Sequence, residues 1–267
     1  MLRSVFSKTL VEQRRSLLWW ALGLATATLL TTAFYPSVRD NAVALSDVIR
    51  SLPEGLRNAL LGQSANFFSP EGYLQARLFS LFAPLLLMIY AIGAGARAIA
   101  GEEEQNTLDI LLSTPVPRRR VFLDKAWAML VALAGLSVVL LLAVAVTGPP
   151  FDVSIPLGRL ASAVAACFLL ASAFGASALA IGAATGRRSL AIGVTSGAAA
   201  GTYLIDVLAL SVDGLGWLQR VSPFYYYRAS EPLSNGLDVG HAAGLAILPI
   251  AAIAAGVLAF EHRDLAS

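Results

Sequence analysis

Long apolar runs separated by short charged segments are the main pattern of this sequence. A helix that crosses a membrane needs about 20 mainly apolar residues, because the hydrocarbon layer is about 30 Å thick and each helical residue rises about 1.5 Å. Six runs reach that length, and the charged residues on either side set their limits. We predict membrane spans over residues 16–36, 76–99, 126–147, 160–186, 189–212 and 241–260.

The aromatic residues and the composition agree with this pattern. All 4 tryptophans lie near predicted span ends, where membrane proteins carry their interfacial aromatic belts. With 57% hydrophobic and 13% charged residues, the 267-residue chain has more apolar side chains than one soluble core can bury. The net charge of +2 argues against a nucleic-acid partner and leaves membrane lipid as the surroundings. We therefore expect a single all-α integral membrane domain over 1–267.

Lysine and arginine indicate which way the spans point. If the N-terminus is cytoplasmic, twelve of the 19 basic residues fall on the inner side of the membrane. Inner segments of membrane proteins carry this excess, so the count predicts two cytoplasmic termini in a multi-pass protein of the inner or plasma membrane. Residues 1–15 have apolar positions near helical spacing. They fit either an interfacial helix or the solvated start of the first span.

The loop between the first two predicted spans is the longest polar segment. Residues 43–52 have the spacing of an amphipathic helix, and residues 53–61 suggest another. Ser69 and Pro70 are suited to the cap and the first position of a further helix, which would start outside the membrane. We expect short helices here that cover the outer mouth of the bundle.

The segment 101–117, between the second and third spans, is the most informative part of the chain. Glu102, Glu103 and Glu104 are consecutive carboxylates, which the helix dipole favours at a helix start. Leucines follow at helical spacing, and two prolines then end the pattern. The pattern fits a short amphipathic helix held outside the membrane. It also fits a solvated turn whose leucines pack on neighbouring spans.

This segment resembles the signature of the membrane subunits of ATP-binding-cassette exporters of the type-two permease family. Those subunits share Gly-Glu-Glu-Glu, then Gly-Thr-Leu, then a leucine-rich stretch that ends in Ser-x-Pro and basic residues. Asn106 stands where the family usually has glycine, a mild departure at a helix start or turn. Further matches are Pro53-Glu54-Gly55-Leu56, Ser222-Pro223-Phe224-Tyr225-Tyr226 and Phe260-Glu261-His262-Arg263-Asp264-Leu265.

The resemblance implies a coupling helix at about Glu102–Ser113 that docks into a cleft on a separate ATPase subunit. The residues implied in that contact are Glu102, Glu103, Glu104, Thr107, Leu108, Leu111, Leu112, Ser113 and Pro115. It also implies two permease chains, in a homodimer or heterodimer, with two ATPases that export an amphipathic or hydrophobic drug, lipid or peptide. The chain has no Gly-x-x-x-x-Gly-Lys-Ser/Thr loop, so we expect ATP and magnesium on the partner and no cofactor on this chain.

Two features inside the spans are further candidates. Gly193, Gly197 and Gly201 recur every fourth residue, a spacing that lets helix backbones approach closely, either within one bundle or at a dimer seam. Asp206 is a carboxylate inside a span, where burial is costly, so we expect it to face protein or water and consider it a candidate contact for substrate. The single cysteine and two isolated histidines do not make a metal site, and no catalytic constellation is visible.

Two other function classes remain open at this stage. An ion- or proton-coupled transporter or channel predicts several ionisable groups within the spans, whereas we find essentially one. A membrane scaffold without transport activity would need only a soluble partner. Co-purification of an ATPase separates the permease interpretation from both.

Overall fold

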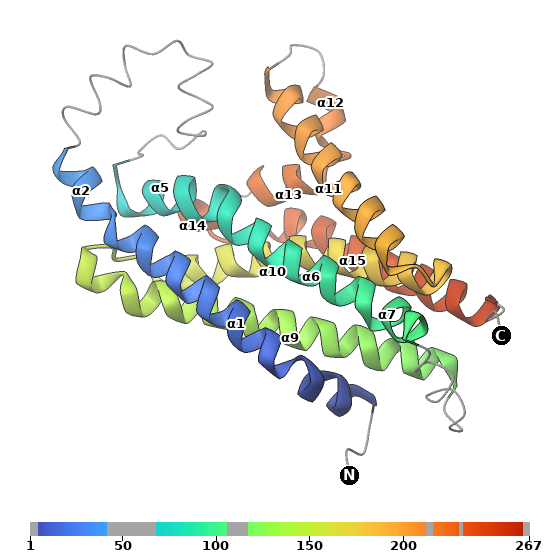
Figure 1. Cartoon of the computed structure of the whole chain (residues 1–267). Coiled ribbons are helices and arrows are strands. Elements are labelled where there is room, and N and C mark those ends of the chain that lie inside the picture. The colour runs from blue at the N-terminus through green and yellow to red at the C-terminus, as the bar shows by residue number, and fades with distance from the viewer. Residues whose placement is uncertain (1–4, 42–67, 106–116, 212–215, 230–231, 264–267) are drawn as a thin grey trace.

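Long helices that run side by side form the body of the protein, as the computed structural model shows (Figure 1). It describes residues 5–41, 68–105, 117–211, 216–229 and 232–263. Within these ranges every regular element is a helix, and 6 helices are long and apolar enough to cross a membrane. The predicted all-α fold with six spans is therefore confirmed.

The spans differ from the predicted ranges mainly at their ends. They comprise α1 (Val5–Ala33) with α2 (Tyr35–Asp40), α5 (Pro70–Leu74) with η1 (Gln75–Phe82) and α6 (Ala83–Ala98), α9 (Arg118–Thr147), α10 (Leu157–Thr185), α11 (Arg188–Ser211) and α15 (Val239–His262). The shorter helices are α7 (Ala100–Glu104), η2 (Pro149–Phe151), α12 (Gly216–Gln219), α13 (Pro223–Ala229) and α14 (Pro232–Asn235).

The first span begins earlier than its apolar run. Helix α1 continues without a break from Val5, so residues 5–15 belong to the same helix as the span and do not form a separate interfacial helix. No proline interrupts this stretch, and Glu12, Gln13 and Arg14 are good helix formers. The Tyr90 hydroxyl on α6 donates to Gln13 Oε1 at 3.0 Å, which ties the polar start of α1 to the bundle.

The second span begins with the predicted cap. The Ser69 hydroxyl accepts a hydrogen bond from the Gly72 amide at 3.1 Å, and Pro70 is the first residue of α5. The helix then widens into the π-helical segment η1 just before Pro84. Proline lacks an amide hydrogen and its ring crowds the carbonyl one turn earlier, so a wider turn relieves the crowding. The amphipathic helices predicted over 43–52 and 53–61 lie outside the described residues.

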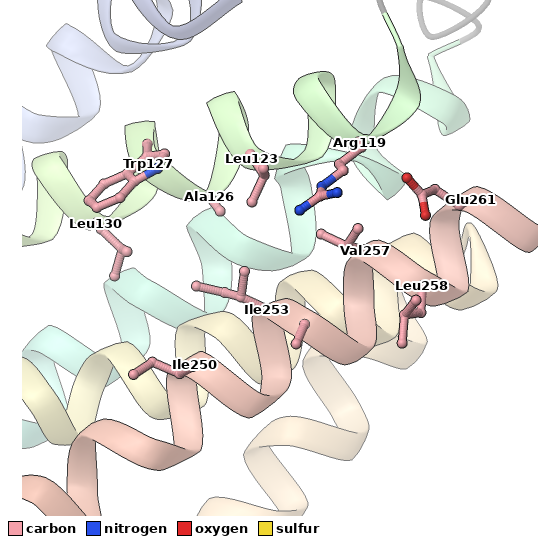
Figure 2. A pocket seen from close by; sticks show the side chains of 11 residues that line it. Arg119, Leu123, Ala126, Trp127, Leu130, Ile250, Ile253, Val257, Leu258 and Glu261 are labelled. Atoms are coloured by element: carbon pink, nitrogen blue, oxygen red, sulfur yellow. The ribbon is translucent and has the colours of Figure 1, made fainter.

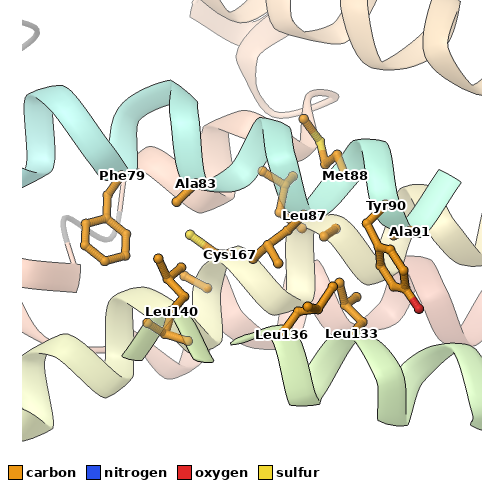
Figure 3. Close-up of a cluster of buried hydrophobic side chains, with 14 of the residues drawn as sticks. Phe79, Ala83, Leu87, Met88, Tyr90, Ala91, Leu133, Leu136, Leu140 and Cys167 are labelled. Carbon is orange, nitrogen blue, oxygen red and sulfur yellow. The ribbon is translucent and has the colours of Figure 1, made fainter. Parts of the chain in front are cut away.

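Helix α10 lies at the centre of the bundle and packs on α6, α9, α11 and α15. Figure 3 shows the cluster where α6, α9 and α10 meet. Leu87, Leu133 and Cys167 have no exposed surface there. Cys167 is therefore the small core residue that its apolar surroundings in the sequence predict.

The start of α1, the end of α15 and α7 lie at one end of the bundle, and α2 lies at the other (Figure 1). At the α2 end, Arg39 Nη1 and Asp152 Oδ2 form an ion pair at 2.7 Å that joins the first span to the turn after α9. Helix α11 starts beside α7 and then rises away from the other long helices (Figure 1). The end of the bundle that carries α7 contains the candidate coupling site.

Candidate functional site

Helix α7 is a short extension of the second span. It follows α6 after Ile99, whose carbonyl accepts from the amides of Glu102 and Glu103 at 3.1 Å. The described part of the coupling segment comprises residues 101–105 and Pro117. The other residues that the resemblance implied in ATPase contact lie outside the described part of the chain: Thr107, Leu108, Leu111, Leu112, Ser113 and Pro115.

Glu102 binds the third span. Its carboxylate oxygen Oε1 accepts a hydrogen bond from Lys125 Nζ in a close ion pair. The Lys125 side chain is only 3% exposed, and the apolar residues Val121, Phe122 and Ala126 around it on α9 are also buried. A buried ammonium group left without its partner costs several kcal/mol, roughly 3–5, so Glu102 fixes α7 firmly to α9.

Glu103 binds the end of the sixth span. Arg263, which directly follows α15, donates from Nη2 to Oε1 at 2.5 Å and from Nη1 to Oε2 at 2.9 Å. This two-point geometry is the strong form of the arginine–carboxylate pair. Nη1 also donates to the Ala183 carbonyl of α10 at 3.1 Å, so the same guanidinium group joins the fourth and sixth spans.

The Glu103–Arg263 pair lies directly over Gly186. This glycine ends α10 with a left-handed φ of 67°, and a Cβ placed on it would lie 2.2 Å from Arg263 Nη2 and 2.7 Å from both carboxylate oxygens of Glu103. Glycine is therefore required here for two reasons: the backbone conformation and the space for the ion pair.

Glu104 binds the start of the fifth span. Its Oε1 accepts a hydrogen bond from the backbone amide of Arg188, the first residue of α11, at 3.0 Å. The first amides of a helix lack partners inside the helix and carry partial positive charge, so a carboxylate is well placed there. The three consecutive glutamates thus contact α9, the end of α15 and the start of α11, while α7 itself continues from α6.

A second set of interactions lies away from α7, around the short helix α13. Arg228 of α13 donates from Nε and Nη2 to the two oxygens of Asp206, both at 3.1 Å. Asp206 is 3% exposed, so this pairing explains how a carboxylate is accommodated on α11. The predicted environment is confirmed in that Asp206 faces protein. Its role as a substrate contact stays a prediction.

The Ser-Pro-Phe-Tyr-Tyr sequence forms the start of α13. The Ser222 hydroxyl donates to the Thr202 carbonyl at 2.9 Å and accepts from the Phe224 amide at 3.2 Å, and Pro223 is the first residue of the helix. The Phe224 ring packs between Phe174 and Tyr203, with centroids 5.8 and 5.3 Å away. This motif therefore docks α13 on α10 and α11.

The glycine repeat of α11 contacts no other part of the described chain. A Cβ placed on Gly193, Gly197 or Gly201 would have no heavy atom within 4 Å, outside the helix itself. Val194 and Leu204 on the same helix are more than half exposed. Of the two uses that the spacing allowed, packing against a neighbouring helix of the same bundle is not what these glycines do.

A comparison with protein families decides the identity. The model of the ABC-2 family transporter proteins matches residues 3–265, nearly the whole chain. The chain belongs to the ABC-2 transporter family. It is thus the multi-pass membrane permease subunit of an ABC transporter, as its signature segment 101–117 and six spans predicted. No curated protein matches the chain.

The sequence did not identify the partners of the glutamates in this ABC-2 permease. Lys125, Arg188 and Arg263 come from three different spans, and Arg263 is 160 positions away from Glu103. Arg263 did belong to the C-terminal stretch that resembled the family, which was the one available signal. Arg228 was also missed, although a lone arginine near Asp206 was a reasonable candidate for its counterion. Within the described residues no group of three or more metal-binding side chains occurs.

Proposed function

We propose that this ABC-2 permease forms the translocation pathway of an exporter for an amphipathic or hydrophobic compound, such as a drug, lipid or peptide. A separate ABC ATPase supplies the energy and binds the ATP and magnesium. Two permease chains and two ATPases make the working unit, and both termini lie in the cytoplasm. The observation that carries this proposal is that α7, at the start of the family signature, is bonded to three further spans.

Helix α7 acts in this proposal as a mechanical junction between the ATPase and the spans. Its carboxylates bind Lys125, Arg263 and the α11 amide, all of which belong to the permease itself. Contact with the ATPase therefore falls mainly to the leucine-rich part of the coupling segment, residues 108–112. A push on that segment reaches several spans at once through short ionic contacts, which transmit displacement better than mobile side chains do.

The buried charged groups described in the spans, Asp206 and Lys125, favour this function over an ion-coupled mechanism. Asp206 is paired with Arg228, and Lys125 is paired with Glu102. A proton- or ion-coupled transporter needs ionisable groups that exchange their partner during the cycle. These pairs instead join helices to each other, as structural contacts do.

The test separates binding of the ATPase from coupling to it. We expect Glu103→Gln to retain the co-purified ATPase while lowering transport per ATP hydrolysed at least about tenfold, the effect of removing one charged two-point contact of about 1.5–3 kcal/mol. Substrate-stimulated ATP hydrolysis and transport would be measured in proteoliposomes. Glu12→Gln is the matched control, because Glu12 is an exposed residue of α1 whose ion pair is with the exposed Lys8.

Leu108→Asp combined with Leu111→Asp tests the contact itself and is expected to release the ATPase. Failure of any ABC ATPase to co-purify with the unaltered permease would overturn the proposed function. If Glu103→Gln released the ATPase instead of uncoupling it, the carboxylate would be part of the docking surface and the assignment of α7 as a junction would be wrong.

A further inference from the structure

A groove on the outer surface of the bundle runs between α9 and α15 (Figure 2). Its volume is about 560 Å³, within the range of about 300–1,000 Å³ that small-molecule sites occupy. Apolar side chains form most of its length, with Leu123 and Leu130 on α9 facing Ile253 and Val257 on α15 (Figure 2). None of these residues belongs to α7 or to the glycine repeat of α11.

The groove opens sideways toward the surroundings of the bundle. Trp127, Ile250 and Leu258 along its edges are 61%, 67% and 58% exposed. Large apolar residues with this exposure on a membrane-spanning segment face lipid chains or another apolar surface. An occupant of the groove therefore enters from the membrane.

The length of the groove matches one leaflet of a bilayer. On α9 its lining extends from Arg119 to Leu130, and on α15 from Ile250 to Glu261. Eleven residues of helix span roughly 17 Å at about 1.5 Å per residue. Half of a hydrocarbon layer about 30 Å thick is about 15 Å, so an acyl chain of one leaflet fits along the groove.

The polar end of the groove carries one positive and one negative group. Arg119 and Glu261 line the end nearest α7, with the guanidinium and carboxylate groups on facing helices (Figure 2). Both residues are exposed, and neither has a hydrogen bond or ion pair within the described part of the chain. A free cation beside a free anion is complementary to a head group that carries a phosphate and an amine.

We propose that this groove binds a phospholipid with a primary amine, of the phosphatidylethanolamine type, in the leaflet next to α7. Arg119 holds the phosphate through its paired N–H donors, and Glu261 accepts from the ammonium group. One acyl chain lies between Leu123, Ile253 and Val257 and ends near Leu130 and Ile250. A phosphatidylcholine head group lacks N–H donors for Glu261, and a phosphatidylglycerol head group lacks the positive charge.

The inference requires only that the chain spans a membrane and does not depend on the ATPase. The full-length protein would be purified in detergent, depleted of lipid, and supplied with equal amounts of phosphatidylethanolamine, phosphatidylcholine and phosphatidylglycerol. Native mass spectrometry then counts what stays bound. We expect phosphatidylethanolamine to be enriched about tenfold, the factor for one additional charge-assisted hydrogen bond.

Two pairs of variants make the test specific. Ala254→Trp fills the groove and is expected to lower phospholipid binding about tenfold. Ala255→Trp is its control, since Ala255 is an exposed neighbour that does not line the groove. Arg119→Gln should weaken all three phospholipids relative to Arg120→Gln, which alters an exposed arginine outside the groove. Glu261→Gln should abolish the preference for phosphatidylethanolamine while binding continues.

Three results would overturn the proposal. The first is equal binding of the three phospholipids by the unaltered protein. The second is equal binding by Ala254→Trp and Ala255→Trp. The third is loss of self-association in Ala254→Trp without loss of lipid, which would assign the groove to a second copy of the chain. Because ATP hydrolysis enters none of these measurements, they leave the proposed transport function untouched.

Discussion

Two sets of glycines in this protein have similar helical settings and opposite surroundings. Between α6 and α10, a Cβ placed on Gly95 would lie 2.2 Å from the Gly175 carbonyl oxygen, and one on Gly175 would lie 2.9 Å from Ala91 Cβ. On α11, a Cβ on Gly193, Gly197 or Gly201 would meet no heavy atom within 4 Å. A neighbouring helix fills the space beside Gly95 and Gly175, whereas the space beside the α11 glycines is open.

The difference shows what each region is built for. Close backbone contact at Gly95 and Gly175 maximises packing between α6 and α10, the main source of helix association in a membrane, where lipid is as apolar as the side chains. The open repeat on α11 leaves a smooth, narrow surface on a helix that diverges from the bundle (Figure 1). Such a surface suits a helix from outside the chain, and we propose that it is the second permease of the working unit.

The largest effect is expected where the glycines are in contact. Gly95→Ala would place a methyl group against the α10 backbone, which cannot rotate away as a side chain can. We expect a loss of about 3 kcal/mol in the free energy of unfolding, the upper part of the usual range for overpacking. Thermal unfolding in detergent, followed by tryptophan fluorescence, measures it.

The same helix provides the control for this prediction. Gly93 lies two residues away on α6, and a Cβ there would have no heavy atom within 4 Å. Alanine is favoured over glycine in a helix by about 1 kcal/mol, so Gly93→Ala should be neutral or stabilising. Equal unfolding temperatures for the two variants would show that α6 and α10 are not in close contact at Gly95.

For the glycine repeat of α11 we expect a smaller effect, on the association of two chains more than on unfolding. Gly197→Leu should leave the unfolding of a single chain unchanged or slightly more costly, because a side chain there meets nothing in the described bundle and leucine favours a helix more than glycine does. It should weaken association of two chains about tenfold, which corresponds to about 1.4 kcal/mol of lost packing. Light scattering of the detergent-solubilised protein over a dilution series reports the association.

Ala198→Leu is the matched change for this experiment, since Ala198 is exposed on another side of the same helix. It adds similar apolar bulk without altering the glycine surface. If both variants associated like the unaltered protein, or if the unaltered protein showed no association at all, the repeat would face lipid and the proposed seam would be wrong.

These contrasts also show how far the sequence could predict the structure. The existence of the spans follows from run length, and the Ser69 cap follows from local chemistry, because both depend on neighbouring residues alone. The glycine spacing predicts that a backbone can approach, but the partner depends on how α11 is angled, which no local pattern encodes. The glutamates were expected to begin a helix, whereas they are the last three residues of α7 (Ala100–Glu104), and their partners come from distant spans.

The smallest predicted effect tests the inward face of α11. Thr195 is 1% exposed on the side opposite the open glycines, and its hydroxyl has no hydrogen-bond partner within the described residues. A buried hydroxyl without a partner costs about 1–3 kcal/mol, whereas a methyl group of similar shape costs nothing comparable. Thr195→Val should therefore stabilise the protein by about 1 kcal/mol in the same unfolding measurement.

Thr202→Val, on the same helix, is expected to change the stability in the opposite direction. The Thr202 hydroxyl donates to the Ala198 carbonyl at 2.8 Å, so its removal loses a hydrogen bond worth about 0.6 kcal/mol in a membrane. Higher stability of Thr195→Val together with slightly lower stability of Thr202→Val would mean that the inward face of α11 contains a buried polar group without a hydrogen bond. Destabilisation at both positions would mean that the Thr195 hydroxyl has a partner, and α11 would then be fixed to the bundle along its inward face. In the proposed transport cycle, a helix fixed in that way would move together with the whole bundle.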